Sequence, residues 1–309
     1  MCTAIYDSKN HLFGRTLDLE YSYNESVIAT PKIFLVKLRC EESFYAQYRI
    51  LGMGIVKQGF PLYYDAMNEK GLAMAGLNFP KSAVYFEEKT GKVNLAPFEL
   101  IPYIIGKCQT IDEAIFFLKK LNVCHISFSN DLSVTPMHWI IADKQRSLVI
   151  ESVKNGLNLY ENDIGVLTNE PPFWYHRTRL EDFKNLSVKE KGTAYTRGLA
   201  SYGLPGDYSS VSRFVRAAFF LKNSIVKANA VTQFYKIFDT VCVPRGAVIL
   251  ENGEDVVTQY TSCMDLVNGI YYYKTYQNSR LCGVRFPKEK EDRLVIYPLS
   301  KQQDIQFFE

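Results

Sequence analysis

The sequence has 309 residues, of which 47% are hydrophobic and 22% charged, an ordinary composition for a globular protein. Its net charge is +3, and the 36 basic and 33 acidic residues are interspersed, so the basic stripe that would indicate a nucleic-acid partner is missing. No apolar stretch approaches the roughly 20 residues needed to cross a bilayer, and we expect no membrane partner.

The first half of the chain is expected to consist mainly of strands. Extended segments are predicted at 3–6 and 11–17 around the turn DSKN, and then at 26–30, 33–38, 47–56, 62–67 and 72–78. The apolar spacing then changes, and two consecutive helices are predicted at 97–108 and 110–121. Thr110 and Glu113 form a capping-box pattern at the start of the second helix.

The second half repeats this alternation of strands and paired helices. Strands are predicted at 138–143, 147–152, 157–162 and 164–169, followed by a polar, loop-rich stretch at 176–207. Apolar residues from Val211 to Phe219 recur at helical spacing, and a further helix is predicted at 229–241. The last strands are predicted at 255–262, 268–276, 281–286 and 293–297, with the charged run 288–293 as a turn. This order favours a layered α+β fold in a single domain spanning residues 1–309.

The cysteines and histidines favour a reducing compartment and no bound metal. The seven cysteines are scattered without a CxxC pair, which argues against a disulfide framework and a zinc site. The four histidines show no ligand spacing, so we expect neither a metal nor another cofactor. The N-terminal residues MCTAIYDSKNH lack the cationic and apolar regions of a signal peptide, which predicts a cytoplasmic protein.

Cys2 is the first candidate for a catalytic residue. A small residue behind the initiator favours removal of Met1, which would leave a thiol and a free α-amine on one residue. The amine can accept the thiol proton directly or through a water, which activates the nucleophile. Position alone is also compatible with an accidental cysteine, so the other motifs must decide.

Arg15 and Asp18 follow the second predicted strand, where the hairpin returns toward the N-terminus. A guanidinium beside a thiol favours the thiolate, and a carboxylate can hold the α-amine. Residues three apart face opposite sides of a regular strand, so the strand must end or bulge between them for both to reach one site. The alternative is an exposed ion pair at a strand end.

Three further polar residues stand at the ends of predicted elements. Asn78 and Asn169 each end an apolar strand, where an amide is a suitable oxyanion donor but also ordinary turn chemistry. Arg213 follows the turn GLPGD near a helix N-terminus, off the apolar stripe. Because the helix dipole disfavours a cation there, Arg213 indicates a carboxylate partner or an anionic ligand; a solvated helix face is the alternative.

Six segments resemble the choloylglycine hydrolase family, which comprises bile salt hydrolases and penicillin V acylases among the N-terminal-nucleophile hydrolases. They are MCTA, FGRxLD, NEKGLxxAGLNF, GVLTNxP, GLPGDYSSVSRF and QYTSCMD…IYYYKTYxNS, in family order over almost the entire chain. The resemblance implies a four-layer αββα sandwich, a homotetramer and hydrolysis of a linear amide. It makes Cys2 the nucleophile and base beside Arg15 and Asp18. It further implies that Asn78 and Asn169 form the oxyanion hole and that Arg213 completes the site.

The resemblance also implies a substrate, namely glycine- or taurine-conjugated bile acids. Asn78 is similar to the bile salt hydrolase pattern, whereas penicillin V acylases tend to carry Tyr there. The sterol-contacting positions implied are Leu17, Phe60, Tyr64, Leu132 and Met137. Thr16 departs from the Asn of the GRNLD motif, and Tyr64 is bulkier than the usual residue. The alternatives are penicillin V acylase or another N-acyl amidase, and a catalytically silent ligand-binding homologue.

Overall fold

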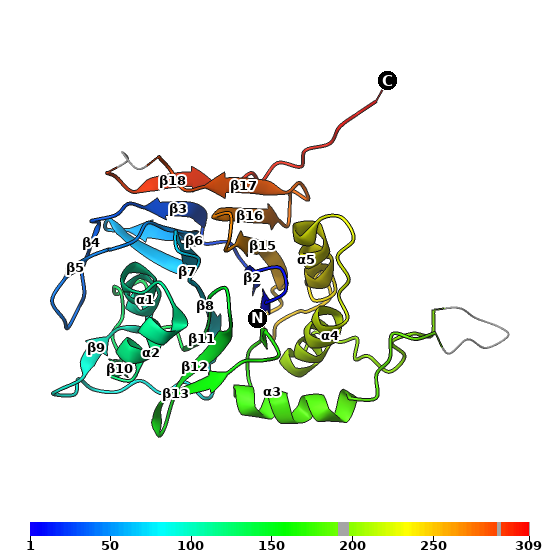
Figure 1. The fold of residues 1–309 in the computed structure, drawn as a ribbon, viewed down its shortest axis with the longest axis horizontal. Coiled ribbons are helices and arrows are strands. Elements are labelled where there is room, and N and C mark those ends of the chain that lie inside the picture. Colours follow the sequence, from blue (N-terminus) through cyan, green and yellow to red (C-terminus); the bar gives the residue numbers. More distant parts are fainter. Residues whose placement is uncertain (191–197, 289–291, 309) are drawn as a thin grey trace.

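The computed structural model describes residues 1–190, 198–288 and 292–308 (Figure 1). The strands are β1 (Cys2–Asp7), β2 (Leu12–Leu19), β3 (Ser26–Thr30), β4 (Leu35–Val36), β5 (Phe44–Tyr45), β6 (Ile50–Lys57), β7 (Phe60–Asn68), β8 (Ala73–Asn78), β9 (Val93–Leu95), β10 (Leu121–Val123), β11 (Met137–Ala142), β12 (Ser147–Val153), β13 (Gly156–Glu161), β14 (Val166–Leu167), β15 (Val257–Asp265), β16 (Ile270–Thr275), β17 (Cys282–Arg285) and β18 (Val295–Pro298). The helices are α1 (Leu100–Lys107), α2 (Ile111–Leu118), α3 (Phe173–Leu180), α4 (Ser210–Lys222) and α5 (Ala230–Asp239), with 3₁₀ turns at Pro97–Glu99 and Glu181–Phe183.

Two antiparallel sheets dominate the described part of the chain. One is six-stranded in the order β14-β1-β2-β15-β16-β17, and the other is eight-stranded in the order β13-β12-β11-β8-β7-β6-β3-β18. Strand β1 lies inside the first sheet, between β14 and β2, so the N-terminus is fixed by hydrogen bonds on both sides. The N-terminal residues are therefore positioned by a sheet rather than by a loop.

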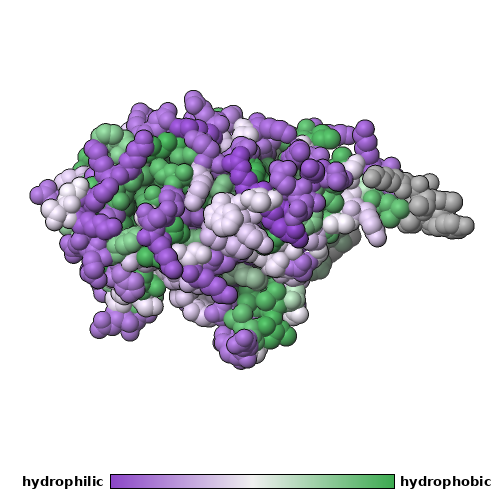
Figure 2. Space-filling model, turned by 90° about the horizontal axis from the view of Figure 1, so that it is seen from below, coloured by the Kyte–Doolittle hydropathy of each residue, from purple (hydrophilic) through white to green (hydrophobic). Residues whose placement is uncertain are grey.

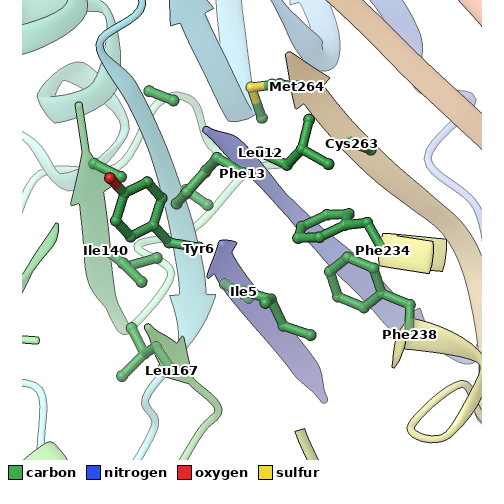
Figure 3. Packing of buried hydrophobic residues seen from close by; sticks show 14 of the residues in the cluster. Ile5, Tyr6, Leu12, Phe13, Ile140, Leu167, Phe234, Phe238, Cys263 and Met264 are labelled. Atoms are coloured by element: carbon green, nitrogen blue, oxygen red, sulfur yellow. The ribbon is translucent and has the colours of Figure 1, made fainter. Parts of the chain in front are cut away.

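The sheets pack face to face and carry helices on their outer faces (Figure 1). Helices α1 and α2 cover the eight-stranded sheet, where Leu100 and Ile104 pack with its apolar side chains. Helices α4 and α5 cover the six-stranded sheet. Figure 3 shows Phe234 and Phe238 of α5 on one side of β1 and β2, and Ile140 of β11 on the other. The predicted α+β fold with four αββα layers is confirmed.

Most of the predicted elements are present, with shifted ends. The predicted strand at 33–38 shrinks to β4, and the one at 164–169 shrinks to β14. The turn predicted at 288–293 includes residues 289–291, which lie outside the described residues. At the start of α2, Thr110 Oγ1 accepts from the amide of Glu113 as predicted. The Glu113 carboxylate accepts from the amide of Gln109 rather than that of Thr110, so the capping box is displaced by one residue.

The prediction of a loop-rich stretch over 176–207 is wrong in its first part. Helix α3 runs to Leu180 and a 3₁₀ turn follows it. The sequence FWYHRTRL buries only Phe173 and His176, three residues apart, so the apolar stripe that marks an amphipathic helix is absent from it. Phe173 packs against Phe214 of α4, and this tertiary contact holds a helix that local spacing does not predict.

Candidate active site

Cys2 is the centre of the candidate site. It is the first residue of β1, its side chain is 3% exposed, and Sγ lies 2.5 Å from Nη2 of Arg15. Its nitrogen donates to Oδ1 of Asn169 at 2.8 Å, and its carbonyl oxygen accepts from Nη1 of Arg213 at 2.5 Å. Arg15, Asn169 and Arg213, which lie far apart in the sequence, thus hold the thiol, the nitrogen and the carbonyl of Cys2.

Met1 is present in this structure, so the Cys2 nitrogen is a peptide amide. It stands where the free α-amine would lie after removal of Met1. Met1 and Asp18 form a backbone pair, in which the Met1 amino group donates to Asp18 O at 2.6 Å and the Asp18 amide donates to Met1 O at 2.9 Å. The acceptor already in place for the Cys2 nitrogen is Asn169, not the carboxylate of Asp18 that the sequence suggested.

Arg15 and Asp18 approach the site from opposite faces of β2. Arg15 reaches Cys2 Sγ between the sheets, whereas the Asp18 carboxylate lies with Thr16 and Thr258 and is 4.0 Å from Arg213. The expectation that β2 ends or bulges between them is wrong, because β2 is continuous from Leu12 to Leu19. The register shift lies in β15, opposite, between Thr258 and Tyr260. Cys2 at a strand end receives groups from both faces.

Arg213 is buried at the site rather than solvated. Its side chain is 1% exposed, and it donates to Cys2 O, to Oγ1 of Thr3 at 2.7 Å and to Oδ1 of Asn169 at 2.8 Å. Burial lowers the pKa of Arg213, while the charges of Asp18 and Cys2 raise it again. The predicted carboxylate partner is therefore Asp18, at the longer distance of 4.0 Å.

The side chain of Asn169 contacts the backbone of Asn78. Nδ2 of Asn169 donates to the carbonyl of Asn78 at 2.8 Å, while Asn169 Oδ1 faces Cys2 and Arg213. Asn78 is the one exposed residue of β8. The side-chain amide of Asn169 thus turns its oxygen to Cys2, and the carbonyl of Asn78 holds its Nδ2 group.

Three of the five predicted substrate positions share one cluster, and the other two lie elsewhere. Phe60, Tyr64 and Leu132 belong to one small cluster of apolar side chains, within which Phe60 stacks edge-on with Phe98. Leu17 pairs directly with Cys2 across β1 and β2. Met137 lies apart from that cluster and pairs with Asn78 across β8 and β11. Phe60 is 8% exposed, so its main role in this structure is packing.

Sequence reasoning missed a set of buried histidines behind Asn169. His176 Nε2 lies 2.9 Å from the carbonyl of Asn169, and His138 Nε2 lies 2.9 Å from that of Thr168. Burial lowers the pKa of His176 to about 4, so the ring is neutral near pH 7 and donates its Nε2 proton to Asn169. The sequence offered no local signal, since neither histidine has a metal-ligand or triad spacing.

Sequence reasoning also missed Asp65, Tyr260 and Tyr271, which form a buried cluster between the sheets. Each oxygen of the Asp65 carboxylate accepts from one phenol, at 2.6 Å from Tyr260 and 2.5 Å from Tyr271. Strands β15 and β16 bring these tyrosines to Asp65 across about two hundred residues of sequence, with separations of 195 and 206. The aromatic segment YYY at 271–273 is a strand signal and says nothing about this partner.

Chemistry, rather than cavity size, locates the site. A cavity of about 770 Å³ lies at the other end of β1, lined by Tyr6 and Asp7, and includes none of the candidate residues.

Within residues 1–190, 198–288 and 292–308, no group of three or more acidic, histidine or cysteine side chains is placed to hold a metal ion. No helix of the described residues is long and apolar enough to cross a membrane. A thiol beside a guanidinium and an asparagine side chain suits nucleophilic attack on a carbonyl.

Comparison with known proteins agrees with this geometry. Residues 2–295 match the family model of linear amide C–N hydrolases, choloylglycine hydrolase family. The chain is 44% identical to a bile salt hydrolase/transferase of Lactiplantibacillus plantarum, with 98% of each chain covered.

Solved structures share the fold, which is that of the N-terminal-nucleophile hydrolases. A crystal structure of a mutant conjugated bile acid hydrolase from Clostridium perfringens is 33% identical and superposes with a TM-score of 0.92, covering 100% of both chains. Penicillin V acylase from Agrobacterium tumefaciens has a TM-score of 0.73 at 18% identity, over 94% of this chain and 87% of its own, and so shares the fold alone. The chain described here therefore belongs to the choloylglycine hydrolase family of linear amide C–N hydrolases.

Proposed function

We propose that the protein is a bile salt hydrolase, which cleaves the amide bond of glycine- or taurine-conjugated bile acids through a thioester on Cys2. The observation that carries the proposal is the setting of Cys2, with Sγ 2.5 Å from the Arg15 guanidinium and its nitrogen 2.8 Å from Asn169 Oδ1. The bile salt hydrolase/transferase at 44% identity supports the substrate class, as does Asn78 in the segment AGLNF.

The active form begins at Cys2. Removal of Met1 frees the backbone groups of Asp18 with which it pairs, and it leaves the Cys2 nitrogen as an amine beside Asn169 Oδ1. An α-amine titrates near 7.7–8.0 and a free thiol near 8.5, so the two groups of Cys2 can exchange a proton close to neutral pH. Retention of Met1 would leave an amide, which cannot act as the base.

The reaction then proceeds in two halves. The thiolate of Cys2 attacks the amide carbonyl carbon, the α-amine holds the thiol proton, and the oxyanion receives a hydrogen bond from Asn169. The tetrahedral intermediate collapses as the α-amine returns the proton to the departing nitrogen, which releases glycine or taurine and leaves a thioester. Water then attacks the thioester, gives up a proton to the same amine, and releases the free bile acid. Arg15 and Arg213 hold Cys2 throughout, with Asp18 as the countercharge of Arg213.

The steroid is expected to lie against the apolar side chains near Cys2. Leu17 pairs with Cys2, and Tyr64 and Leu132 are partly buried at the edge of the adjoining cluster. Tyr23 lies 6.5 Å from Tyr64, ring centre to ring centre, and adds an exposed aromatic face. Apolar and aromatic walls of this kind suit a steroid ring system.

Parallel assays on the purified protein test the proposed substrate. Glycine release from glycocholate is expected to exceed phenoxyacetate release from penicillin V by at least about tenfold in kcat/KM, since a matched apolar contact alone discriminates on that order. The Cys2→Ala variant, prepared in the same way, controls for contaminating amidases. Absence of glycine release would overturn the bile salt assignment. Phenoxyacetate release alone would indicate a penicillin V acylase, and no release from either would indicate a silent homologue.

We further propose that the chain is a single domain that works in the bacterial cytoplasm as a homotetramer. Tyr202, Phe307 and Phe308 are 84%, 83% and 86% exposed, and Figure 2 shows hydrophobic patches among hydrophilic residues on one face. Exposed apolar patches mark surfaces at which proteins associate. Light scattering is expected to give about 142 kDa, four times the 35.5 kDa of one chain. A mass near 35.5 kDa at micromolar concentration would refute the tetramer.

A further inference from the structure

Asp65 is a fully buried carboxylate for which the proposed reaction has no direct use. It is 0% exposed, on β7 of the eight-stranded sheet, and both of its hydrogen-bond partners are phenols of the six-stranded sheet. Burying a carboxylate costs several kcal/mol unless it is paired with a charge or fully hydrogen-bonded. Two phenols satisfy its oxygens without neutralising it, so a positive charge close by is to be expected.

Arg15 is a fully buried cation of the same region, and no carboxylate in the described part of the chain pairs with it directly. Its guanidinium donates to the carbonyl oxygens of Thr16, Tyr64 and Gly76 at 3.1, 3.3 and 2.7 Å, and to Cys2 Sγ. Among the described residues, no carboxylate forms an ion pair with it within 4.0 Å. Carbonyl oxygens satisfy its hydrogens but leave its unit charge uncompensated.

The backbone of β7 connects the two groups. Tyr64, whose carbonyl accepts from Arg15, is the residue before Asp65. Burial lowers the pKa of Arg15, but Cys2, the Tyr260 oxygen and the carboxylates of Asp65 and Asp18 together raise it further than burial lowers it. For Asp65 itself, burial raises the pKa. Arg15 has the largest effect in lowering it again, followed by the phenols of Tyr260 and Tyr271.

We propose that Asp65, held by Tyr260 and Tyr271, is a positioning residue that balances the charge of Arg15 and so sets how strongly this guanidinium favours the Cys2 thiolate. The inference rests on the proposed role of Cys2 as nucleophile. Without the negative charge of Asp65, nothing on β7 offsets the positive charge that Arg15 places on the Cys2 sulfur. More thiolate then forms at low pH, but each thiolate is a weaker nucleophile, because nucleophilicity falls with thiol basicity.

Other charged and titratable groups around Arg15 and the thiol are unchanged by the Asp65→Asn substitution. They are the Cys2 α-amine, Arg15 and Asp18 of β2, Arg213 of α4, Tyr64 of β7, Glu25 before β3, and Tyr260 and Tyr271 of β15 and β16. His176, behind Asn169, is neutral above about pH 5 because burial lowers its pKa to about 4. The charge of Asp65 can be removed without touching a group that contacts Cys2.

The test is the pH dependence of Cys2 alkylation by iodoacetamide in the Asp65→Asn protein, followed on the N-terminal peptide so that the other cysteines do not contribute. The midpoint of the rate profile is expected to fall by about one pH unit, as for loss of one buried charge at an effective dielectric near 20. The plateau rate at high pH is expected to fall about threefold. A merely structural role would loosen Arg15 from Cys2 and so leave the midpoint unchanged or raise it.

Two further variants keep the test decisive. Asp163→Asn, whose carboxylate is 68% exposed, also removes one negative charge and is expected to leave the midpoint unchanged. If Asp65→Asn fails to fold, the double variant Tyr260→Phe and Tyr271→Phe keeps the carboxyl but removes both donors. Its carboxyl then protonates more readily, and the midpoint is expected to fall in the same direction.

The outcomes separate this inference from the proposed function, because alkylation needs no bile salt turnover. A lowered midpoint in a protein that does not hydrolyse glycocholate would support the role of Asp65 and contradict the substrate. An unchanged midpoint in an active enzyme would overturn the role of Asp65 alone. A Cys2 thiol that fails to alkylate at any pH in the unmodified protein would overturn both.

Discussion

Replacement of Cys2 by alanine is expected to lower glycine release from glycocholate by at least about 10⁴-fold, since the nucleophile is lost while the surrounding groups remain. The fold should persist, because Cys2 is a small side chain at the start of β1 and its backbone contacts to Asn169 and Arg213 are kept. Alanine also permits removal of Met1, so the two proteins share the same N-terminus. The measurement is kcat from initial rates, together with thermal unfolding of both proteins.

A second cysteine variant serves as the control for Cys2→Ala. Cys282→Ala removes a thiol from the edge strand β17 of the same sheet, and its activity is expected to stay within about twofold of the unmodified protein. If Cys2→Ala kept more than a hundredth of the turnover, Cys2 would not be the nucleophile. If both variants lost activity equally, general sensitivity to cysteine replacement would explain the loss.

Replacement of Asn169 by alanine is expected to lower kcat/KM by about 10²–10³-fold, the usual effect of removing one oxyanion donor. The substitution removes two things at once. It takes away the Nδ2 donor, and it takes away the Oδ1 acceptor shared by the Cys2 nitrogen and Arg213. Steady-state kinetics with glycocholate measure the sum of both losses.

Asn169→Asp separates the two contributions. It keeps an oxygen toward Cys2 and Arg213 but places a second oxygen against the carbonyl of Asn78, where Nδ2 now donates at 2.8 Å. If the donor matters most, this variant should lose as much as Asn169→Ala. The exposed Asn185→Ala serves as the control and should be unchanged. Retention of more than a tenth of the activity in Asn169→Ala would contradict an oxyanion role.

Local patterns predicted the layers of the fold well because each layer has its own period. Residues of β12 alternate between the two faces of a sheet, and the apolar residues from Val211 to Phe219 repeat along one side of α4. Helix α3 escaped prediction because its sequence buries only Phe173 and His176, and its stability depends on Phe214 in a later helix. Contacts between helices far apart in the chain leave no local period.

The candidate site was predictable where a residue breaks a local rule. Arg213 lies near a helix N-terminus, against the dipole, and the structure places it on Cys2, Thr3 and Asn169. Asp65 stands among the apolar and aromatic residues of β7, and nothing in that segment identifies its partners. Its pairing with Tyr260 and Tyr271 depends on how two sheets stack, and the register between sheets is set by the complete core.

The central claim, that Cys2 freed of Met1 performs the hydrolysis, is tested most directly by one paired measurement. The purified protein and its Cys2→Ala variant are each weighed intact by mass spectrometry and assayed for glycine release from glycocholate. The account predicts that both proteins lack Met1 and that only the one with Cys2 releases glycine. An active protein that retains Met1, or an active Cys2→Ala variant, would contradict it.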